Sequence, residues 1–217
     1  SVEVLIDDGS EVEVGDIALE VSGKAQSILS TERLVLNIMQ RMSGIATKTR
    51  KIADKIKGTR AKVLDTRKTT PGIRQLEKMA VVIGGGMNHR FGLYDMIMLK
   101  DNHIDFVGGV RNAIEKTKAY VRAMDKPIDV EIEIRTKAEL MEAISTGGVQ
   151  RILLDNFTPE ALKELGPLIP DSIESEASGG ITESSILAYA ETGVDFISMG
   201  ALTHSVKSLD LSLKAYF

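Results

Sequence analysis

Residues 128–180, IDVEIEIRTKAELMEAISTGGVQRILLDNFTPEALKELGPLIPDSIESEASGG, contain three short apolar segments that each end in polar residues. The segments 128–134, 152–154 and 173–177 read as strands, and a fourth follows at 196–199, so that one recurs about every 22 residues. A helical stretch follows each of them. Alternating strands and helices predict a parallel α/β sheet or barrel with its active site at the carboxyl ends of the strands. Periodicity alone leaves a doubly wound sheet open as the alternative.

Two earlier segments extend this pattern towards the N-terminus. Residues 61–64 end at Asp65, and residues 96–99 end at Lys100. The first part of the chain reads differently, with short antiparallel strands at 2–6, 12–14 and 17–21 separated by Asp-Gly and Gly-Asp turns. A helix is then expected, capped by Ser30 or Thr31 and ending near Gly58, because apolar residues recur there at helical spacing. The sequence therefore predicts a small β unit, a long helix and a larger βα region.

Composition excludes several classes of protein. The 217 residues contain no cysteine, which excludes disulfides, thiolate metal sites and a cysteine nucleophile. No apolar run approaches the roughly 18 residues of a membrane span, and the acidic start has no secretory character. We therefore expect a soluble cytoplasmic protein with no membrane partner.

Charge is distributed unevenly along the chain. Residues 41–104 carry 14 Lys and Arg against 5 Asp and Glu, whereas the remainder carries 13 against 26. The basic stretch lacks the interleaved aromatic residues that stack on bases, so we expect no nucleic-acid partner. Small phosphorylated or carboxylated substrates are the better interpretation.

Three polar segments supply cations near predicted strand ends. Arg67 and Lys68 lie in the run 65–72, where a guanidinium fork and an ammonium could bind a carboxylate or phosphate. His89 and Arg90 follow three consecutive glycines, and Lys100 ends the next strand. The alternative for 65–72 is a solvated turn. The three histidines have no zinc-ligand spacing.

Carboxylates occupy the following strands. Glu131 and Glu133 share one face of their strand because side chains alternate with a period of two. If that face points into a barrel, both are buried near the cations. Together with Asp155 they could bind ribose hydroxyls or Mg²⁺, which prefers oxygen ligands. A structural ion-pair network is the alternative.

Two glycine segments complete the candidate residues. Ser178, Gly179 and Gly180 lead from a strand end into an expected helix, and Gly200 and Ala201 do the same after the last strand. Backbone N–H groups at a helix N-terminus favour anions, and barrel enzymes often bind phosphate at their last loops.

Several of these motifs together resemble the quinolinate phosphoribosyltransferase family, also called nicotinate-nucleotide pyrophosphorylases. The resemblance covers essentially the whole chain, in order. It is carried by the runs SGIAT (43–47), DTRKTTPG (65–72), GGGMNHR (84–90), KDNH (100–103), LDN (154–156), SGGI (178–181) and GALTH (200–204).

The resemblance implies that quinolinate and phosphoribosyl pyrophosphate give nicotinate mononucleotide, pyrophosphate and carbon dioxide with Mg²⁺, in NAD biosynthesis. It assigns Arg67, Lys68, His89, Arg90 and Lys100 to the quinolinate pocket. It places Glu133, with Glu131 beside it, and Asp155 at the ribose and the magnesium ion. Phosphate is assigned to Ser178, Gly179, Gly180, Gly200 and Ala201. The groups assigned to catalysis are Lys68, Lys100, Glu133 and Asp155. Arg33 resembles an arginine that a partner subunit inserts into the pocket.

The same resemblance implies an N-terminal α/β sandwich, incomplete here, followed by an open TIM-like α/β barrel. The expected division is a sandwich remainder with its long helix at 1–57, a barrel domain at 58–204, and a segment returning to the sandwich at 205–217. The family works as a homodimer or as a hexamer made of three dimers.

The same sequence admits other interpretations. A molybdenum-transport-associated paralogue of the same family acts on another substrate, and the pairs Arg67-Lys68 and His89-Arg90, suited to two carboxylates, argue against it. Residues 8–24 also resemble half of a biotinyl or lipoyl carrier module, with Lys24 as the attachment site.

Overall fold

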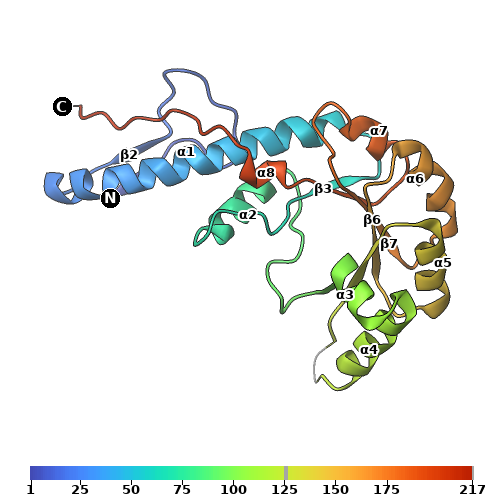
Figure 1. Cartoon of the computed structure of the whole chain (residues 1–217). Helices are drawn as coiled ribbons and strands as arrows, with labels where there is room; N and C mark the ends of the chain where they lie inside the picture. The colour runs from blue at the N-terminus through green and yellow to red at the C-terminus, as the bar shows by residue number, and fades with distance from the viewer. Residues whose placement is uncertain (125–126, 217) are drawn as a thin grey trace.

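The computed structural model describes residues 1–124 and 127–216 and has a mixed α/β fold (Figure 1). Six parallel strands form the main sheet, in the order β3-β8-β7-β6-β5-β4. Their bounds are β3 Lys62–Leu64, β4 Ile97–Leu99, β5 Val130–Ile134, β6 Arg151–Asp155, β7 Glu174–Ser178 and β8 Phe196–Ser198. All six strands were predicted from the sequence, with ends within about two residues, the usual uncertainty of such assignments.

The strand order decides between the two predicted architectures. Strands β4 to β8 lie in sequence order, and β8 pairs with β3, the first strand of the series. Every crossover therefore runs in the same direction around the sheet, whereas a doubly wound sheet reverses direction at its middle. Among the described residues no pairing joins β3 to β4. The sheet is that of an α/β barrel open between β3 and β4.

Helices α3 to α7 flank the curved sheet, whereas α2 and α8 lie beside α1 Ala25–Lys55 (Figure 1). The bounds of these helices are α2 Arg74–Ile83, α3 Asp101–Val107, α4 Val110–Arg122, α5 Lys137–Thr146, α6 Pro159–Leu165, α7 Ile186–Ala190 and α8 Ala201–His204, with a short 3₁₀ turn at Gly166–Leu168. Side-chain caps fix two of the starts: the hydroxyl of Thr136 accepts the N–H of Glu139, and that of Thr158 accepts the N–H of Ala161. Alternate strand residues such as Ile132 and Ile134 join the apolar core. Their neighbours Glu131 and Glu133 face the other way, into the barrel.

The N-terminal unit consists of β1 Val2–Val4, β2 Leu19–Val21 and the helix α1 Ala25–Lys55. In Figure 1 the first half of α1 extends beyond the barrel, and the C-terminal trace runs back beside it. The N–H of Leu209 donates to the carbonyl of Gln40, and the Gln40 amide donates to the carbonyl of Leu211 at 2.9 Å. These bonds join the end of the chain to the middle of α1.

Two details of the N-terminal prediction are wrong. Residues 12–14 form no strand; Val12 and Val14 are exposed and pair with no neighbouring strand. The helix also begins six residues earlier than the expected cap, because Lys24 is the residue before its first turn. Ser30 and Thr31 lie inside α1, where their hydroxyls donate to the carbonyl of Ser27. A Ser or Thr can bond back along a helix in this way instead of capping it.

The predicted division of the chain stays a prediction. The boundary at 57/58 falls between α1 and β3, and residue 217 of the predicted segment 205–217 lies outside the described residues. Lys24, the attachment site in the carrier-module interpretation, directly precedes α1. Within the described residues, no helix is long and apolar enough to cross a membrane.

Candidate active site

The loop after β3 carries Arg67 and Lys68, both exposed. Its backbone is held from α8, because the Thr203 hydroxyl donates to the carbonyl of Lys68 at 2.9 Å. The Lys68 side chain passes close to Gly200: a Cβ at that position would lie 3.0 Å from Lys68 Cδ. The absence of a side chain at Gly200 therefore leaves room for the lysine at the carboxyl edge of the sheet.

His89 and Arg90 follow the glycine run and are nearly enclosed. Burial lowers the pKa of the Arg90 guanidinium, and the nearby charge of Arg67 lowers it further. The two arginines therefore lie close enough to repel, while the charges of Glu131 and Asp95 act on Arg90 in the opposite direction. Neighbouring cations that repel each other are suited to an anionic ligand, because such a ligand reduces their mutual repulsion.

Both ring nitrogens of His89 face protein groups. Nδ1 accepts the backbone N–H of Arg90 at 2.8 Å, so the ring proton lies on Nε2. Nε2 lies 2.8 Å from an oxygen of Glu131 and 3.6 Å from an oxygen of Glu176. Burial lowers the pKa of His89. The imidazole is thus turned towards the barrel interior rather than towards the rim.

Glu131 and Glu176 are fully buried below His89. Burial raises the pKa of both carboxyls, and the proximity of Glu131 contributes to raising that of Glu176 to about 8. Ligand atoms of the two glutamates and His89 lie within 4.8 Å of one another, a spacing that a metal ion could bridge. However, Arg151 donates to Glu176 at 3.3 Å, and a guanidinium at this distance disfavours a second cation.

The acidic part of the rim lies at the ends of β5 and β6. Glu133 and Asp155 are half-buried, and burial raises the pKa of both carboxyls. The charge of Asp101 raises both pKa values further, and Lys100 opposes these effects at both groups. Carboxylate oxygens in such a cluster are the ligands that Mg²⁺ prefers.

The loop after β7 packs tightly against the end of β6. Asn156, which has a left-handed backbone (φ 58°), donates its amide to Asp155 at 2.5 Å and its backbone N–H to the carbonyl of Ser178. A Cβ at Gly179 would lie 2.2 Å from the Asn156 side-chain oxygen. Glycine is therefore required at this contact, which brings Ser178, Gly179 and Asp155 together.

One predicted feature of these loops is wrong. No helix begins directly after Gly180, because α7 starts at Ile186. Residues 182–185 form a turn in which the N–H of Thr182 donates to the Ser185 hydroxyl. The polar side chains of this turn satisfy backbone groups that a helix was expected to leave free. The second loop agrees with its prediction, since α8 begins at Ala201, directly after Gly200.

The structure brings the predicted barrel residues together at one edge of the sheet, except that Glu131 lies deeper in the barrel, and it leaves Arg33 apart. Arg33 is exposed on the part of α1 that precedes Arg41. Residues that sequence reasoning missed are the buried Asp65, Glu77, Lys78 and Glu176 and the partly buried Arg151. Glu176 had a visible signal: β7 alternates Glu174, Glu176 and Ser178 on one face, as β5 alternates Glu131 and Glu133.

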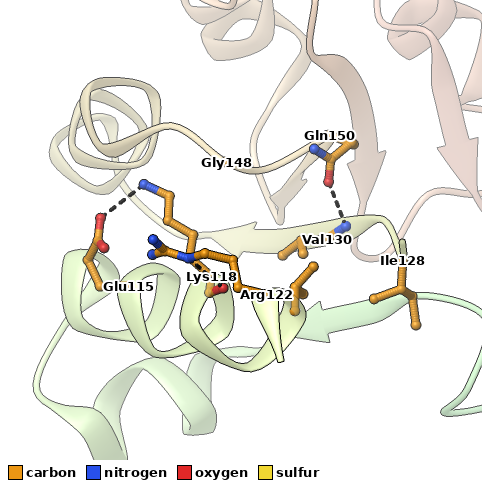
Figure 2. Close-up of a pocket in the computed structure, with 8 residues that line it drawn as sticks. Glu115, Lys118, Arg122, Ile128, Val130, Gly148 and Gln150 are labelled. Carbon is orange, nitrogen blue, oxygen red and sulfur yellow. Dashed lines mark hydrogen bonds and ion pairs between the residues drawn. The ribbon is translucent and has the colours of Figure 1, made fainter. Parts of the chain in front are cut away.

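A cavity of about 380 Å³ lies elsewhere, between α4 and the start of β5 (Figure 2). Val130 begins β5, and its N–H donates to Gln150, which precedes β6. The cavity is therefore at the amino edge of the sheet, opposite the candidate site. Lys118, its central cation, already donates to Glu115 and to the carbonyl of Thr146.

Comparisons with known proteins extend this description. The model of the quinolinate phosphoribosyl transferase C-terminal domain matches residues 45–214, and that of the N-terminal domain matches residues 1–43. A probable nicotinate-nucleotide pyrophosphorylase [carboxylating] of Bacillus subtilis is 48% identical over 206 residues, covering 95% of this chain and 70% of the relative. The chloroplastic nicotinate-nucleotide pyrophosphorylase of Arabidopsis thaliana is 45% identical, covering 98% and 65%.

Two solved structures have nearly the same fold as this chain. NadC from Streptococcus pyogenes is 42% identical and superposes with a TM-score of 0.92, covering 99% of this chain and 75% of that one. The nicotinate-nucleotide pyrophosphorylase of Francisella tularensis is 40% identical, with a TM-score of 0.90, covering 98% and 74%. The chain thus spans about two thirds to three quarters of the length of these relatives.

Proposed function

The chain belongs to the quinolinate phosphoribosyltransferase family, and on this premise we propose that it transfers phosphoribosyl from phosphoribosyl pyrophosphate to quinolinate. The products are nicotinate mononucleotide, pyrophosphate and carbon dioxide, in the synthesis of NAD. One observation carries the proposal. Mutually repelling cations and half-buried carboxylates lie at the carboxyl edge of one parallel sheet, where barrel enzymes hold their substrates.

The two kinds of group match the two substrates. Quinolinate is a dicarboxylate, and the neighbouring guanidiniums of Arg67 and Arg90 supply forks suited to carboxylates. Lys68 and Lys100 add point charges beside Asp155. We assign the ribose to Glu133 rather than to Glu131, because Glu131 is fully enclosed and turned towards His89.

Phosphate is assigned to the loops after β7 and β8, which carry Ser178, Gly179, Gly180, Gly200 and Ala201. The side-chain-free backbone at the glycines permits close approach of a phosphate. Lys68 reaches across Gly200, so a cation already lies at this loop. The arrangement supports binding of a phosphorylated sugar whose C1 faces the dicarboxylate pocket.

The chemistry needs positioning and electrostatics more than acid or base groups. The pyridine nitrogen attacks C1 of the ribose while the C1–O bond breaks. The electron pair of the C1–O bond leaves with pyrophosphate. Glu133 and Asp155 stabilise the positive charge that develops on the ribose. The ring nitrogen, now a pyridinium, accepts the electron pair released when the adjacent carboxylate departs as carbon dioxide, and a proton from solvent completes the ring carbon.

Magnesium fits the acidic rim. Burial raises the pKa of Glu133 and of Asp155, the charge of Asp101 raises both further, and Asp155 also raises that of Glu133, so three carboxylates lie close together. When bound, Mg²⁺ would neutralise pyrophosphate charge. Glu133 and Asp155 are the residues that would hold the ion, in part through water and substrate oxygens.

The test is an assay of the purified protein with quinolinate, phosphoribosyl pyrophosphate and Mg²⁺ that follows both nicotinate mononucleotide and carbon dioxide. Nicotinate replaces quinolinate in the control. Activity with quinolinate and none with nicotinate supports a pocket for two carboxylates. A folded protein that turns over neither acid contradicts the proposal and favours the paralogue with another substrate.

A homodimer or a hexamer made of three dimers is part of the proposal, with Arg33 acting in the partner's site. Its exposure on α1, away from the barrel edge, supports this role. Arg33→Ala and Lys68→Ala are each expected to be inactive, and subunit exchange between them should restore part of the activity. Absence of recovery in exchanged mixtures would place both residues in the site of a single chain. A cytoplasmic location stays a prediction.

A further inference from the structure

Helix α2 carries two consecutive charged residues that are both fully buried. Glu77 is 0% exposed and Lys78 is 1% exposed. Charged side chains are almost never buried this completely unless they are paired, because removing a charge from water is costly. Neither residue belongs to the proposed catalytic groups. Their burial therefore calls for partners within the protein, and those partners differ.

Glu77 binds the loop after β3. Its carboxylate accepts the Thr70 N–H at 2.9 Å and the Thr70 hydroxyl at 2.8 Å. On the other side it accepts Nε and Nη2 of Arg41 at 3.0 and 2.9 Å. Arg41, on α1, also donates to the carbonyl of Thr203. Glu77 thus joins the loop that carries Arg67 and Lys68 to two other elements.

Lys78 binds the loop before β4. Its ammonium donates to the Asp65 carboxylate and, at 2.9 Å, to the carbonyl of His89. The same oxygen of Asp65 accepts the N–H of His89 at 2.9 Å. Both backbone groups of His89 are therefore bound by one buried ion pair. Arg90 is the next residue.

Helix geometry explains how adjacent residues reach different loops. Consecutive side chains on an α-helix point about 100° apart. Helix α2 lies beside the barrel edge near α1 and α8 (Figure 1). The Glu77 side chain meets the loop after β3, and the Lys78 side chain meets the loop that follows the helix itself. A single rigid helix can therefore hold both.

We propose that Glu77 and Lys78 are positioning residues: Glu77 sets the loop that presents Arg67 and Lys68, and Lys78 sets the loop that presents His89 and Arg90. The proposal rests on the proposed function for the identity of the substrate. The division of labour between the two residues does not depend on it. A purely structural role would instead make both residues stabilise the whole barrel without distinction.

Amide hydrogen exchange resolved by residue tests this division. In Glu77→Gln, exchange of the Thr70 amide should accelerate roughly tenfold or more, because the side chain that accepts its N–H loses its negative charge and its ion pair with Arg41. Exchange of the His89 amide should stay within about twofold of the wild type. In Lys78→Met the pattern reverses. Ile114→Val, a small core change on α4 far from both loops, is the matched control and should alter neither amide.

Kinetics then link the loops to the substrate. Both variants should raise the KM for quinolinate by roughly tenfold or more, because the misplaced cations bind carboxylates less well. Ile114→Val should leave KM unchanged. Where a wild-type protein turns over no quinolinate, the proposed function fails and the exchange result still decides the positioning roles.

The following results would overturn the proposal. Equal acceleration at Thr70 and His89 in both variants means uniform loosening, and no change at either amide means that the buried pairs hold nothing. If Glu77→Gln or Lys78→Met does not fold, the milder variants Thr70→Val and Lys78→Gln replace them, each removing one of the bonds described. These variants should shift exchange in their own loop only, and an effect on the other loop would contradict the division.

Discussion

The two parts of the proposed site are built in different ways. Arg67, Lys68 and Arg90 lie on loops between β3 and β4, whereas Glu133 and Asp155 lie on β5 and β6. The strand residues take their direction from the sheet, because the register of parallel strands fixes which face each side chain occupies. The loop residues are not held by hydrogen bonds to neighbouring strands in this way. They depend on buried side chains brought from other elements.

This difference has an energetic counterpart. The loops are held by Arg41, Glu77, Lys78 and Asp65, all wholly or largely removed from water. Burial raises the pKa of Asp65 and lowers that of Lys78, because removal from water disfavours the charged form of each group. Pairing offsets this cost, and breaking one partner of a buried pair is strongly destabilising. Loop-borne groups therefore need more supporting structure than strand-borne ones.

The largest expected effect comes from removing the cations themselves. Lys100→Ala and Arg67→Ala should each lower kcat/KM for quinolinate by roughly 10³-fold, because each deletes a preorganised charge aimed at the substrates. Both side chains are exposed, so thermal unfolding should stay within a few degrees of the wild type. Steady-state kinetics and calorimetry measure the two quantities. Arg111→Ala, an exposed arginine on α4, is the control. Unchanged kcat/KM in either variant would remove that residue from the site.

An intermediate effect is expected on the strand-borne side. Glu133→Gln should lower kcat by roughly 10²-fold with little change in the KM for quinolinate, because the carboxylate acts on the ribose in the transition state. The fold should tolerate the change, since burial already raises the pKa of Glu133 and disfavours its charge. A large rise in the KM for quinolinate with kcat intact would show that Glu133 contacts the acid and not the sugar.

The smallest expected effect is on the thermal stability of the protein and involves Glu176, which is buried beneath the site. The pKa of Glu176 is raised from 4.5 to about 8, so the folded state retains a proton that the unfolded state loses. The stability from this proton is fully present below about pH 4.5 and is lost as the pH rises through about 8. Glu176→Gln cannot lose the proton. Its melting temperature relative to the wild type should therefore rise between pH 5 and pH 8.

Unfolding of both proteins across that range measures the effect. Glu174→Gln is a matched control, because Glu174 lies two residues earlier on the same strand and its side chain is half exposed. A constant difference between Glu176→Gln and the wild type at every pH would mean that Glu176 keeps its charge when folded. The charge of Arg151 would then dominate over burial.

Much of the fold could be predicted from the sequence, because local periodicity carries it. Every strand of the main sheet was predicted, because short apolar runs that end in Asp65, Lys100 or Asp155 can be recognised in the sequence. The strand expected at 12–14 is wrong for a related reason. Alternation indicates that a segment could form a strand, but a strand also needs a neighbour to bond with, and Val14 has none.

The sequence by itself determined the βα repeat, the concentration of cations between 41 and 104, and the residues at the strand ends that now meet at one edge. These follow from patterns of near neighbours along the chain. Only the tertiary structure decided that Glu131 turns to His89 while Glu133 faces the rim, and that Glu77 and Lys78 hold separate loops. Those outcomes depend on burial and on partners up to dozens of residues away, as between Arg41 and Glu77. The free energy of a charged side chain is set by what surrounds it after folding, and its position in the sequence does not specify those surroundings.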